Sequence, residues 1–181
     1  MRREDLLPWH RIPTTRGYDP LGRSCKQARS NRRGHQGVVL IVGYTTGVFD
    51  LFHIGHLNIL RAARGLCDRL IVGVTVDELV TYKGKQAVVP FSERIEIVRA
   101  CRYVDTAVAQ VDIDKVRAWE RLKFDVLFVG DDWYDAPQWR DYENRLEAVG
   151  AKVRYLPYTT STSSTQLAAA LDLLVRGARS T

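Results

Sequence analysis

From residue 38 onward, five short apolar runs alternate with stretches of helical pattern. The runs are rich in Val, Ile and Leu and lack a polar–apolar alternation, which is typical of central parallel strands covered on both faces. They occupy residues 38–43, 70–76, 106–111, 126–129 and 153–156. Helices are expected at 56–66, 92–102, 114–122, 138–148 and 164–176. Because strands alternate with helices, we expect right-handed crossovers and an α/β fold with a doubly wound, five-stranded parallel sheet.

Two local signals support individual helices. Leu57, Leu60 and Ala63 recur every three residues and predict a buried stripe on the first helix. Ser163 is expected to cap the last helix, because Gln166 stands at the capping-box position. In such sheets, ligands bind at the carboxyl ends of the strands. We therefore expect functional residues in the loops that follow the strands.

The positive charge of the chain lies in its first 36 residues. The chain has a formal net charge of +6, and residues 1–36 hold nine of the 27 basic side chains but three of the 21 acidic ones. Residues 37–181 hold 18 of each sign. A basic face for nucleic acid is therefore not expected on the folded part, and a nucleic-acid binder would depend on the first 36 residues alone.

Residues 1–36 also contain several prolines and glycines and lack a hydrophobic period. This composition predicts a basic, disordered N-terminal extension to one domain at 37–181. Four interpretations stay open: an arm for phosphates or a partner, a dispensable tail, a segment upstream of the true start near residue 38, or an organelle transit peptide. The acids and prolines disfavour the last of these.

Hydropathy and cysteine usage argue against two further classes of protein. No apolar run approaches the roughly 20 residues that a membrane-spanning helix needs, and the first residues lack the apolar stretch of a signal peptide. The three cysteines are odd in number and lack a C-x-x-C spacing, which argues against a disulfide framework or a zinc site. We expect a cytoplasmic protein without membrane insertion.

The segment GVFDLFHIGH at 47–56 joins the first predicted strand to the first predicted helix. Such a turn aims free backbone N–H groups and the positive end of the helix dipole beyond the strand, which favours anions. His53 and His56 can face one pocket and donate hydrogen bonds to phosphate oxygens, and Gly55 permits close approach. Asp50 could orient a histidine, cap the turn or meet a metal ion.

This motif and four further elements in the same order resemble the HxGH nucleotidyltransferases, and within them the glycerol-3-phosphate cytidylyltransferases. The resemblance covers residues 38–171. Its other elements are Lys83 with Lys85, RYVD at 102–105, GDDW at 130–133 and SST at 163–165. It implies a Rossmann-like nucleotidyltransferase fold.

The resemblance also implies roles for individual residues. Catalytic contacts to the triphosphate and the reacting phosphorus are expected from His53, His56, Lys85 and Arg102. Contacts to the second substrate are expected from Lys83 and Lys115. Nucleotide binding is expected from Val48, Phe49, Ile54, Gly55, Asp131, Asp132, Tyr158, Ser163, Ser164 and Thr165. A free carboxylate at 131 or 132 could accept from the cytosine amino group or bind magnesium.

The implied reaction is one in-line displacement, in which a phosphate oxygen of glycerol 3-phosphate attacks the α-phosphorus of CTP. CDP-glycerol and pyrophosphate are the products. A phosphate oxygen is already anionic near pH 7, so positioning and charge neutralisation carry the rate without a general base. Mg²⁺ bound with CTP is the expected cofactor, and a homodimer with the histidine motif near its interface is the expected assembly.

The last motif departs from the family pattern R-T-E-G-I-S-T-T. Tyr158 replaces the arginine and offers one hydroxyl instead of a bidentate fork. Either another basic residue such as Arg154 compensates, or the acceptor substrate differs. One aromatic cluster is interpreted as packing and not as a base-stacking platform: Trp133, Tyr134 and Trp139.

Alternative functions follow from these departures. They are a cytidylyltransferase for another phospho-alcohol or phospho-amino-alcohol, and an adenylyltransferase of the same superfamily that forms FAD or an ADP-sugar. The GDDW segment favours CTP. A non-catalytic nucleotide-binding module is the rival class, and the presence of both histidines, both loop lysines and Arg102 argues against it.

Overall fold

A computed structural model of the chain describes residues 40–82, 86–134 and 137–178. The sheet has five parallel strands in the order β3-β2-β1-β4-β5. The strands are β1 (Val42–Gly47), β2 (Arg69–Thr75), β3 (Thr106–Gln110), β4 (Val126–Gly130) and β5 (Lys152–Leu156). The order reverses between β1 and β4, so the sheet is doubly wound. The predicted α/β fold with a five-stranded parallel sheet is confirmed.

The helices lie close to the predicted stretches. They are α2 (Ile54–Arg64), α4 (Phe91–Arg99), α5 (Lys115–Leu122), α6 (Pro137–Ala148) and α7 (Ser164–Ala178). Two short elements were not predicted, α3 (Asp77–Tyr82) and the 3-10 turn η1 (Asp131–Trp133). Both are too short to show a helical period in the sequence.

The first strand lies later than the sequence predicted. It was expected at 38–43, but β1 pairs with β2 from Val42 to Gly47. The side chain of Asp125 accepts from the Val42 N–H at 2.7 Å and so fixes the beginning of the strand. The apolar run did not mark the strand correctly, because its Leu40 is 61% exposed and outside the core, whereas the polar Thr45 in the strand interior is buried.

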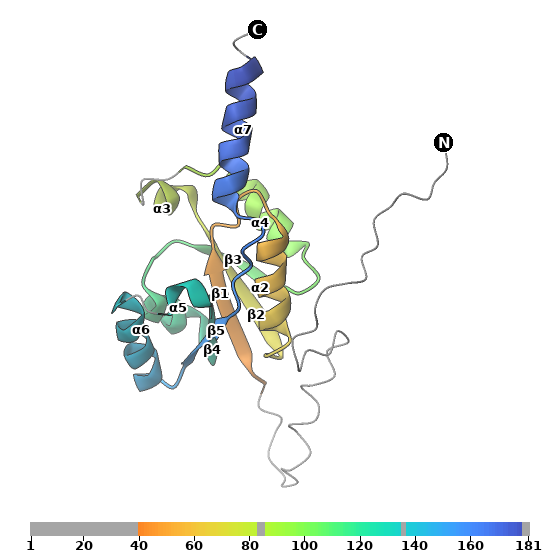
Figure 1. Cartoon of the computed structure of the whole chain (residues 1–181). Helices are drawn as coiled ribbons and strands as arrows, with labels where there is room; N and C mark the ends of the chain where they lie inside the picture. The colour runs from red at the N-terminus through yellow and green to blue at the C-terminus, as the bar shows by residue number, and fades with distance from the viewer. Residues whose placement is uncertain (1–39, 83–85, 135–136, 179–181) are drawn as a thin grey trace, which may run out of the picture. The chain divides into compact units, whose positions relative to one another are not determined.

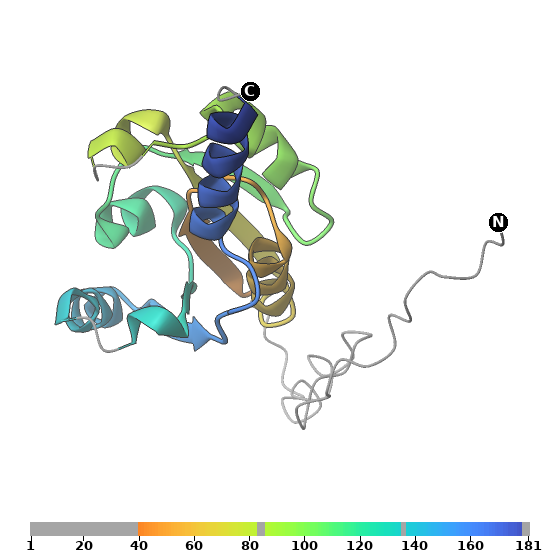
Figure 2. The ribbon, with the colours of Figure 1, turned by 45° about the horizontal axis from the view of Figure 1, so that its top comes forward.

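The helices cover both faces of the sheet, as Figures 1 and 2 show. α2 and α4 lie on one face and α5 and α6 on the other. Leu60 and Ala63 of α2 are buried in one core cluster, as the i+3 stripe predicted, whereas Leu57 is half-buried. Ala118 of α5 and Leu146 of α6 belong to the second cluster. The two cores hold the strands rigid, so the strand ends are fixed in place.

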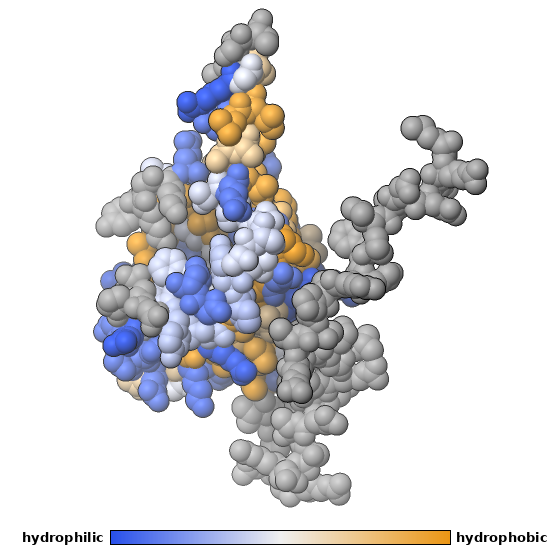
Figure 3. Space-filling view, in the orientation of Figure 1, coloured by the Kyte–Doolittle hydropathy of each residue, from blue (hydrophilic) through white to orange (hydrophobic). Residues whose placement is uncertain are grey.

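α7 differs from the other helices because its second half is exposed. Figure 3 shows apolar side chains gathered along it, and Leu173 and Leu174 are 71% and 70% exposed. In the part of the chain that the structure describes, no helix is both long and apolar enough to cross a membrane.

The chain divides into two units, Met1–Gly37 and Val38–Thr181. The predicted N-terminal extension at 1–36 lies outside the described residues, so its character stays a prediction.

Candidate active site

A cavity of about 630 Å³ opens at the carboxyl ends of the strands. The last residues of four strands line it: Gly47, Thr75, Gln110 and Gly130. α2 and α7 both begin at its wall, since His53 and Gly55 line it on one element and Ser163, Ser164 and Thr165 on the other. Two helix N-termini at one cavity provide free N–H groups and partial positive charge, which favour an anion.

The two histidine rings lie against each other at the beginning of α2, with ring centroids 3.9 Å apart and planes tilted by 34°. His53 Nδ1 accepts from the Gly55 N–H at 3.1 Å, and His56 Nδ1 accepts from the His53 N–H at 3.4 Å. Each ring therefore caps the helix with Nδ1 and carries its proton on Nε2. His53 Nε2 lies 3.3 Å from Ser164 Oγ, which donates to the Asp50 carbonyl at 2.7 Å.

Both histidines are neutral near pH 7. Burial lowers the pKa of His56 to about 3, and the adjacent His53 ring acts in the same direction. Burial also lowers the pKa of His53. A neutral imidazole with its proton on Nε2 is a hydrogen-bond donor, so both rings can donate to phosphate oxygens without being charged beforehand.

Gly55 is required by the ring of His53. A Cβ atom at residue 55 would lie 2.8 Å from His53 Cε1, closer than side-chain carbons approach. The glycine therefore lets the first histidine fold back over the helix start.

The loop before the histidines is strained and held by Asp50. Phe49 and Leu51 have φ of 55° and 46°, which are unfavourable for residues with a side chain. The buried Asp50 carboxylate accepts from the N–H groups of Leu51, Val88 and Val89 at 2.9–3.0 Å. Of the three roles left open for Asp50, fixing the turn is the one that these bonds provide.

Arg94 also holds this loop, and the sequence analysis did not indicate that role. Its guanidinium is buried at 1% exposure on α4. It donates to the carbonyls of Val48, Thr75 and Val89, the latter two at 2.9 Å, and pairs with Asp77 at 2.5 Å. Three segments therefore meet at one side chain, and two of them line the cavity, at Val48 and Thr75.

A polar network forms the floor of the cavity beside β3. The Gln110 side-chain oxygen accepts from Thr46 and, at 2.8 Å, from Thr75, and its amide donates to the Asp112 carbonyl at 3.0 Å. Gln110 and Thr75 are buried at strand ends. The sequence analysis did not name them, and the signal that could have found them is a polar residue near the end of an apolar run.

The two acids after β4 have different surroundings. Asp131 accepts from the Tyr158 N–H at 2.9 Å and thereby holds the loop after β5. Asp132 lines the cavity and folds over Gly130, where a Cβ atom would lie 2.4 Å from its Oδ1. Partial burial raises the pKa of Asp132, and the charge of Asp131 adds to the rise. Asp132 is the carboxylate available to a ligand.

The segment between β5 and α7 closes one side of the cavity. The Asn58 side chain donates to Thr159 Oγ1 at 3.1 Å and joins this segment to α2. Ser163 and Gln166 bond each other reciprocally at 3.0 and 3.2 Å, so the predicted capping box is confirmed. Ser164 joins this end of the chain to the histidine loop, because its hydroxyl donates to the Asp50 carbonyl and lies 3.3 Å from His53 Nε2.

Most of the predicted site residues come together at this cavity. Its wall includes His53, His56, Val48, Phe49, Gly55, Lys115, Asp132, Tyr158, Ser163, Ser164 and Thr165. Asp131 is exposed and does not line the cavity, and Ile54, 45% exposed, does not line it either. Lys83 and Lys85 lie outside the described residues. Arg154 is exposed on β5 and does not line the cavity, so it does not compensate for the arginine that Tyr158 replaces.

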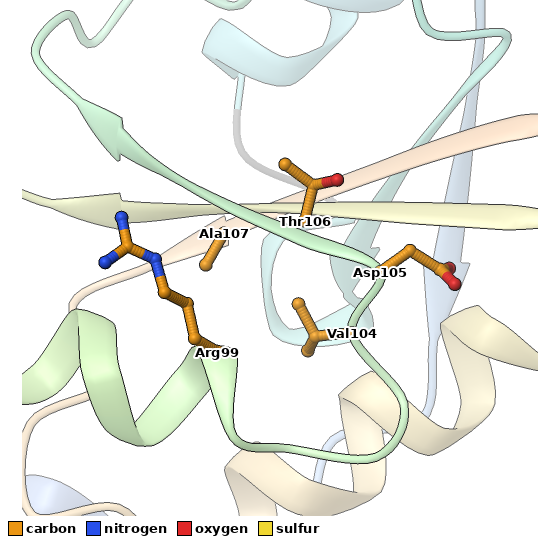
Figure 4. Close-up of a pocket in the computed structure, with 5 residues that line it drawn as sticks. All are labelled: Arg99, Val104, Asp105, Thr106 and Ala107. Carbon is orange, nitrogen blue, oxygen red and sulfur yellow. The ribbon is translucent and has the colours of Figure 1, made fainter.

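Arg102 is not brought to the cavity. It lies before β3, at the amino ends of the strands, and stacks on Tyr103 at 5.8 Å. The same end carries a small hollow of about 240 Å³, where Arg99 and Asp105 point apart (Figure 4). The expected contact of Arg102 with the reacting phosphoryl group is therefore not formed within one chain.

Comparison with known proteins identifies the family. The cytidylyltransferase-like family profile matches residues 44–170. The FAD synthase of Pyrococcus abyssi is 36% identical over 133 residues, which are 69% of this chain and 84% of that protein. The glycerol-3-phosphate cytidylyltransferase of Bacillus subtilis is 32% identical over 132 residues, which are 68% of this chain and 91% of that protein.

Solved structures show the same fold. The lipopolysaccharide core biosynthesis protein of Thermoplasma volcanium superposes with a TM-score of 0.59 at 23% identity, over 68% of this chain and 100% of that one. With five parallel strands, the paired histidines at the first helix and a profile match over most of the domain, this chain belongs to the cytidylyltransferase-like family of nucleotidyltransferases.

Proposed function

We propose that this chain transfers CMP from CTP to a small phosphorylated alcohol and releases pyrophosphate. Glycerol 3-phosphate is the first candidate acceptor, and CDP-glycerol would be its product. One observation carries the proposal: two neutral, adjacent histidines and two helix N-termini line one cavity at the carboxyl end of the sheet.

The geometry suits charge stabilisation in an in-line displacement. An oxygen of the acceptor phosphate would attack the α-phosphorus, and the bond from the α-phosphorus to the oxygen that bridges to the β-phosphate would break. Because the attacking oxygen is already anionic, no proton needs to be removed. The Nε2–H groups of His53 and His56 and the N–H groups at the start of α7 would donate to oxygens that gain charge. Because their Nδ1 atoms are held by the helix, the rings need little reorganisation.

The position of Asp132 favours a nucleotide whose base carries an exocyclic amino group. Its carboxylate lines the cavity and accepts hydrogen bonds when ionised. Cytosine and adenine have such an amino group, whereas uracil has none. The site is therefore expected to prefer CTP or ATP to UTP.

Magnesium would enter with the triphosphate. No group of three or more His, Cys, Asp or Glu side chains among the described residues could hold a metal ion. Mg²⁺ is commonly held by substrate phosphates with one or two carboxylates and water, and Asp132 is a carboxylate in the wall. The ion would neutralise triphosphate charge.

A second candidate is adenylyl transfer to a flavin phosphate. It is favoured by the name of the relative from P. abyssi, FAD synthase, which is more similar in sequence than the B. subtilis protein. Asp132 does not distinguish the two, because adenine and cytosine both donate from an amino group. The acceptor decides between them.

The experiment measures pyrophosphate release with CTP, ATP, UTP and GTP, each combined with glycerol 3-phosphate, phosphoethanolamine or FMN. His56→Ala is the control, because it removes one donor and its cap. Turnover with CTP and glycerol 3-phosphate supports the proposal, and turnover with ATP and FMN replaces it by the second candidate. If no pair exceeds the control, the chain is not a transferase for these substrates and a non-catalytic nucleotide-binding module takes its place.

A further inference from the structure

One donor at the cavity wall has no hydrogen-bond partner among the described residues. It is the indole Nε1 of Trp139, a residue that lines the cavity and is 7% exposed. The indole N–H is a donor only, so it needs an oxygen from elsewhere. Buried polar groups without a partner are rare, and each needs an explanation.

Packing holds this indole in place. Its ring lies 5.6 Å from that of Tyr142 in an edge-on contact and 6.2 Å from that of Trp133. Trp139 also belongs to the core cluster on the α5–α6 face, with Leu127 and Leu146. A ring fixed on several sides cannot turn freely to find another partner.

The same wall carries a buried cation. Lys115 is 8% exposed at the beginning of α5 and lines the cavity together with Trp139. Arg145 on α6 pairs at 2.9 Å with Asp114, which caps α5. This ion pair fixes the beginning of α5 against α6, so the wall is rigid before a ligand arrives.

We propose that Trp139 is a substrate-binding residue whose indole N–H donates to an oxygen of the acceptor substrate. The inference rests on the proposed function and specifies its acceptor subsite, on the α5–α6 side of the cavity. The histidines lie on the α2 side, where they serve the triphosphate. An ammonium of Lys115 and an N–H donor on one wall favour an acceptor rich in hydroxyl or phosphate oxygens.

The test replaces the N–H and keeps the ring shape. Trp139 is replaced by benzothienylalanine, which has sulfur in place of N–H, and in a second variant by Phe. Trp119 receives the same replacements as the matched control, because it packs half-buried against the same cluster and does not line the cavity. Steady-state kinetics are measured for CTP and for glycerol 3-phosphate, and thermal unfolding is measured without ligand.

The benzothienylalanine variant is expected to raise the KM for glycerol 3-phosphate about 3- to 30-fold, the range of one lost hydrogen bond. Its kcat and its KM for CTP should stay within about twofold of the wild type, since the triphosphate contacts are intact. The Tm of the free protein should not fall, because the deleted donor has no partner in the described structure. The Trp119 variants should leave both KM values unchanged.

Three results would overturn the inference. They are an unchanged KM for glycerol 3-phosphate, a rise in the KM for CTP instead, and a clear fall in Tm with benzothienylalanine, which would reveal a partner within the protein. If the wild type turns over no substrate pair, the proposed function fails separately. The inference is then decided by the Tm shift that glycerol 3-phosphate or inorganic phosphate induces, and equal shifts in wild type and variant reject it.

Discussion

Arg94 offers the sharpest test of how the cavity is held together. The change is Arg94→Met, which keeps an unbranched side chain and removes the guanidinium. In the folded protein this group donates to three carbonyls, from segments that lie five to 46 residues away, and pairs with Asp77. Its removal leaves three carbonyls without this donor, of which the Thr75 carbonyl is in a buried bond and the other two are partly buried.

The expected cost is about 3–5 kcal/mol in the free energy of unfolding, which is the range for removing one partner from a buried ionic network. The Asp77 side chain is 50% exposed and can be solvated, so most of the cost comes from the three carbonyls. A domain of this size is stable by about 5–15 kcal/mol, and the Tm should fall by about 10 °C. Arg94→Lys should lose about 2 kcal/mol, because one ammonium cannot reproduce the planar fork.

Urea unfolding followed by circular dichroism gives the free energy of unfolding, and a thermal scan followed by the same signal gives the Tm. Arg99→Met is the matched control: it lies on the same helix, and its exposed ion pair with Glu96 is expected to contribute less than about 0.5 kcal/mol. If Arg94→Met and Arg99→Met destabilise the protein to within about 1 kcal/mol of each other, the argument that Arg94 holds the loop is wrong.

Three further predictions concern the cavity. Gly130→Ala should displace the Asp132 carboxylate, which a Cβ atom would meet at 2.4 Å, and raise the KM for the nucleotide about tenfold in steady-state assays with little change in Tm. Ser164→Ala removes the hydroxyl between His53 and the loop, so kcat should fall about tenfold in the same assay, and an unchanged kcat would contradict that role. Burial lowers the folded-state pKa of His56 to about 3, whereas the ordinary pKa of a histidine is near 6.5. Between these two pH values the unfolded chain therefore binds more protons than the folded protein. The free energy of unfolding should therefore decrease as pH falls from 6.5 toward 3, by up to about 1.4 kcal/mol per pH unit, and urea titrations of His56→Asn should show a smaller slope.

The sequence predicted the architecture because the strands are apolar runs and the helices have an apolar period. It placed the first strand too early, since pairing with β2 and the bond from Asp125 select Val42 as its beginning and the apolar character of the run does not. The histidines and the capping box at Ser163 followed from local spacing, which the structure keeps.

Residues whose environment depends on distant segments could not be predicted. Arg94 reads as a solvated helix residue, because the three carbonyls that bury it come from other parts of the chain. Arg102 was expected in the site by resemblance, but its segment precedes β3 and lies at the other end of the sheet. The unpaired indole of Trp139 depends on how α6 packs, so its sequence context gave only the prediction of a packing residue.

The histidines use their two nitrogen atoms for different purposes, and this links folding to chemistry. Nδ1 of each ring caps α2, which fixes both the rotamer and the tautomer. The same bond therefore leaves the proton on Nε2, the atom that can donate to a phosphate. Since burial keeps the rings neutral, positive potential at the cavity comes from the starts of α2 and α7 and from Lys115, and not from imidazolium charge. The two histidine rings are therefore oriented before a ligand arrives, because the contacts that stabilise the helix are also the contacts that orient the donors.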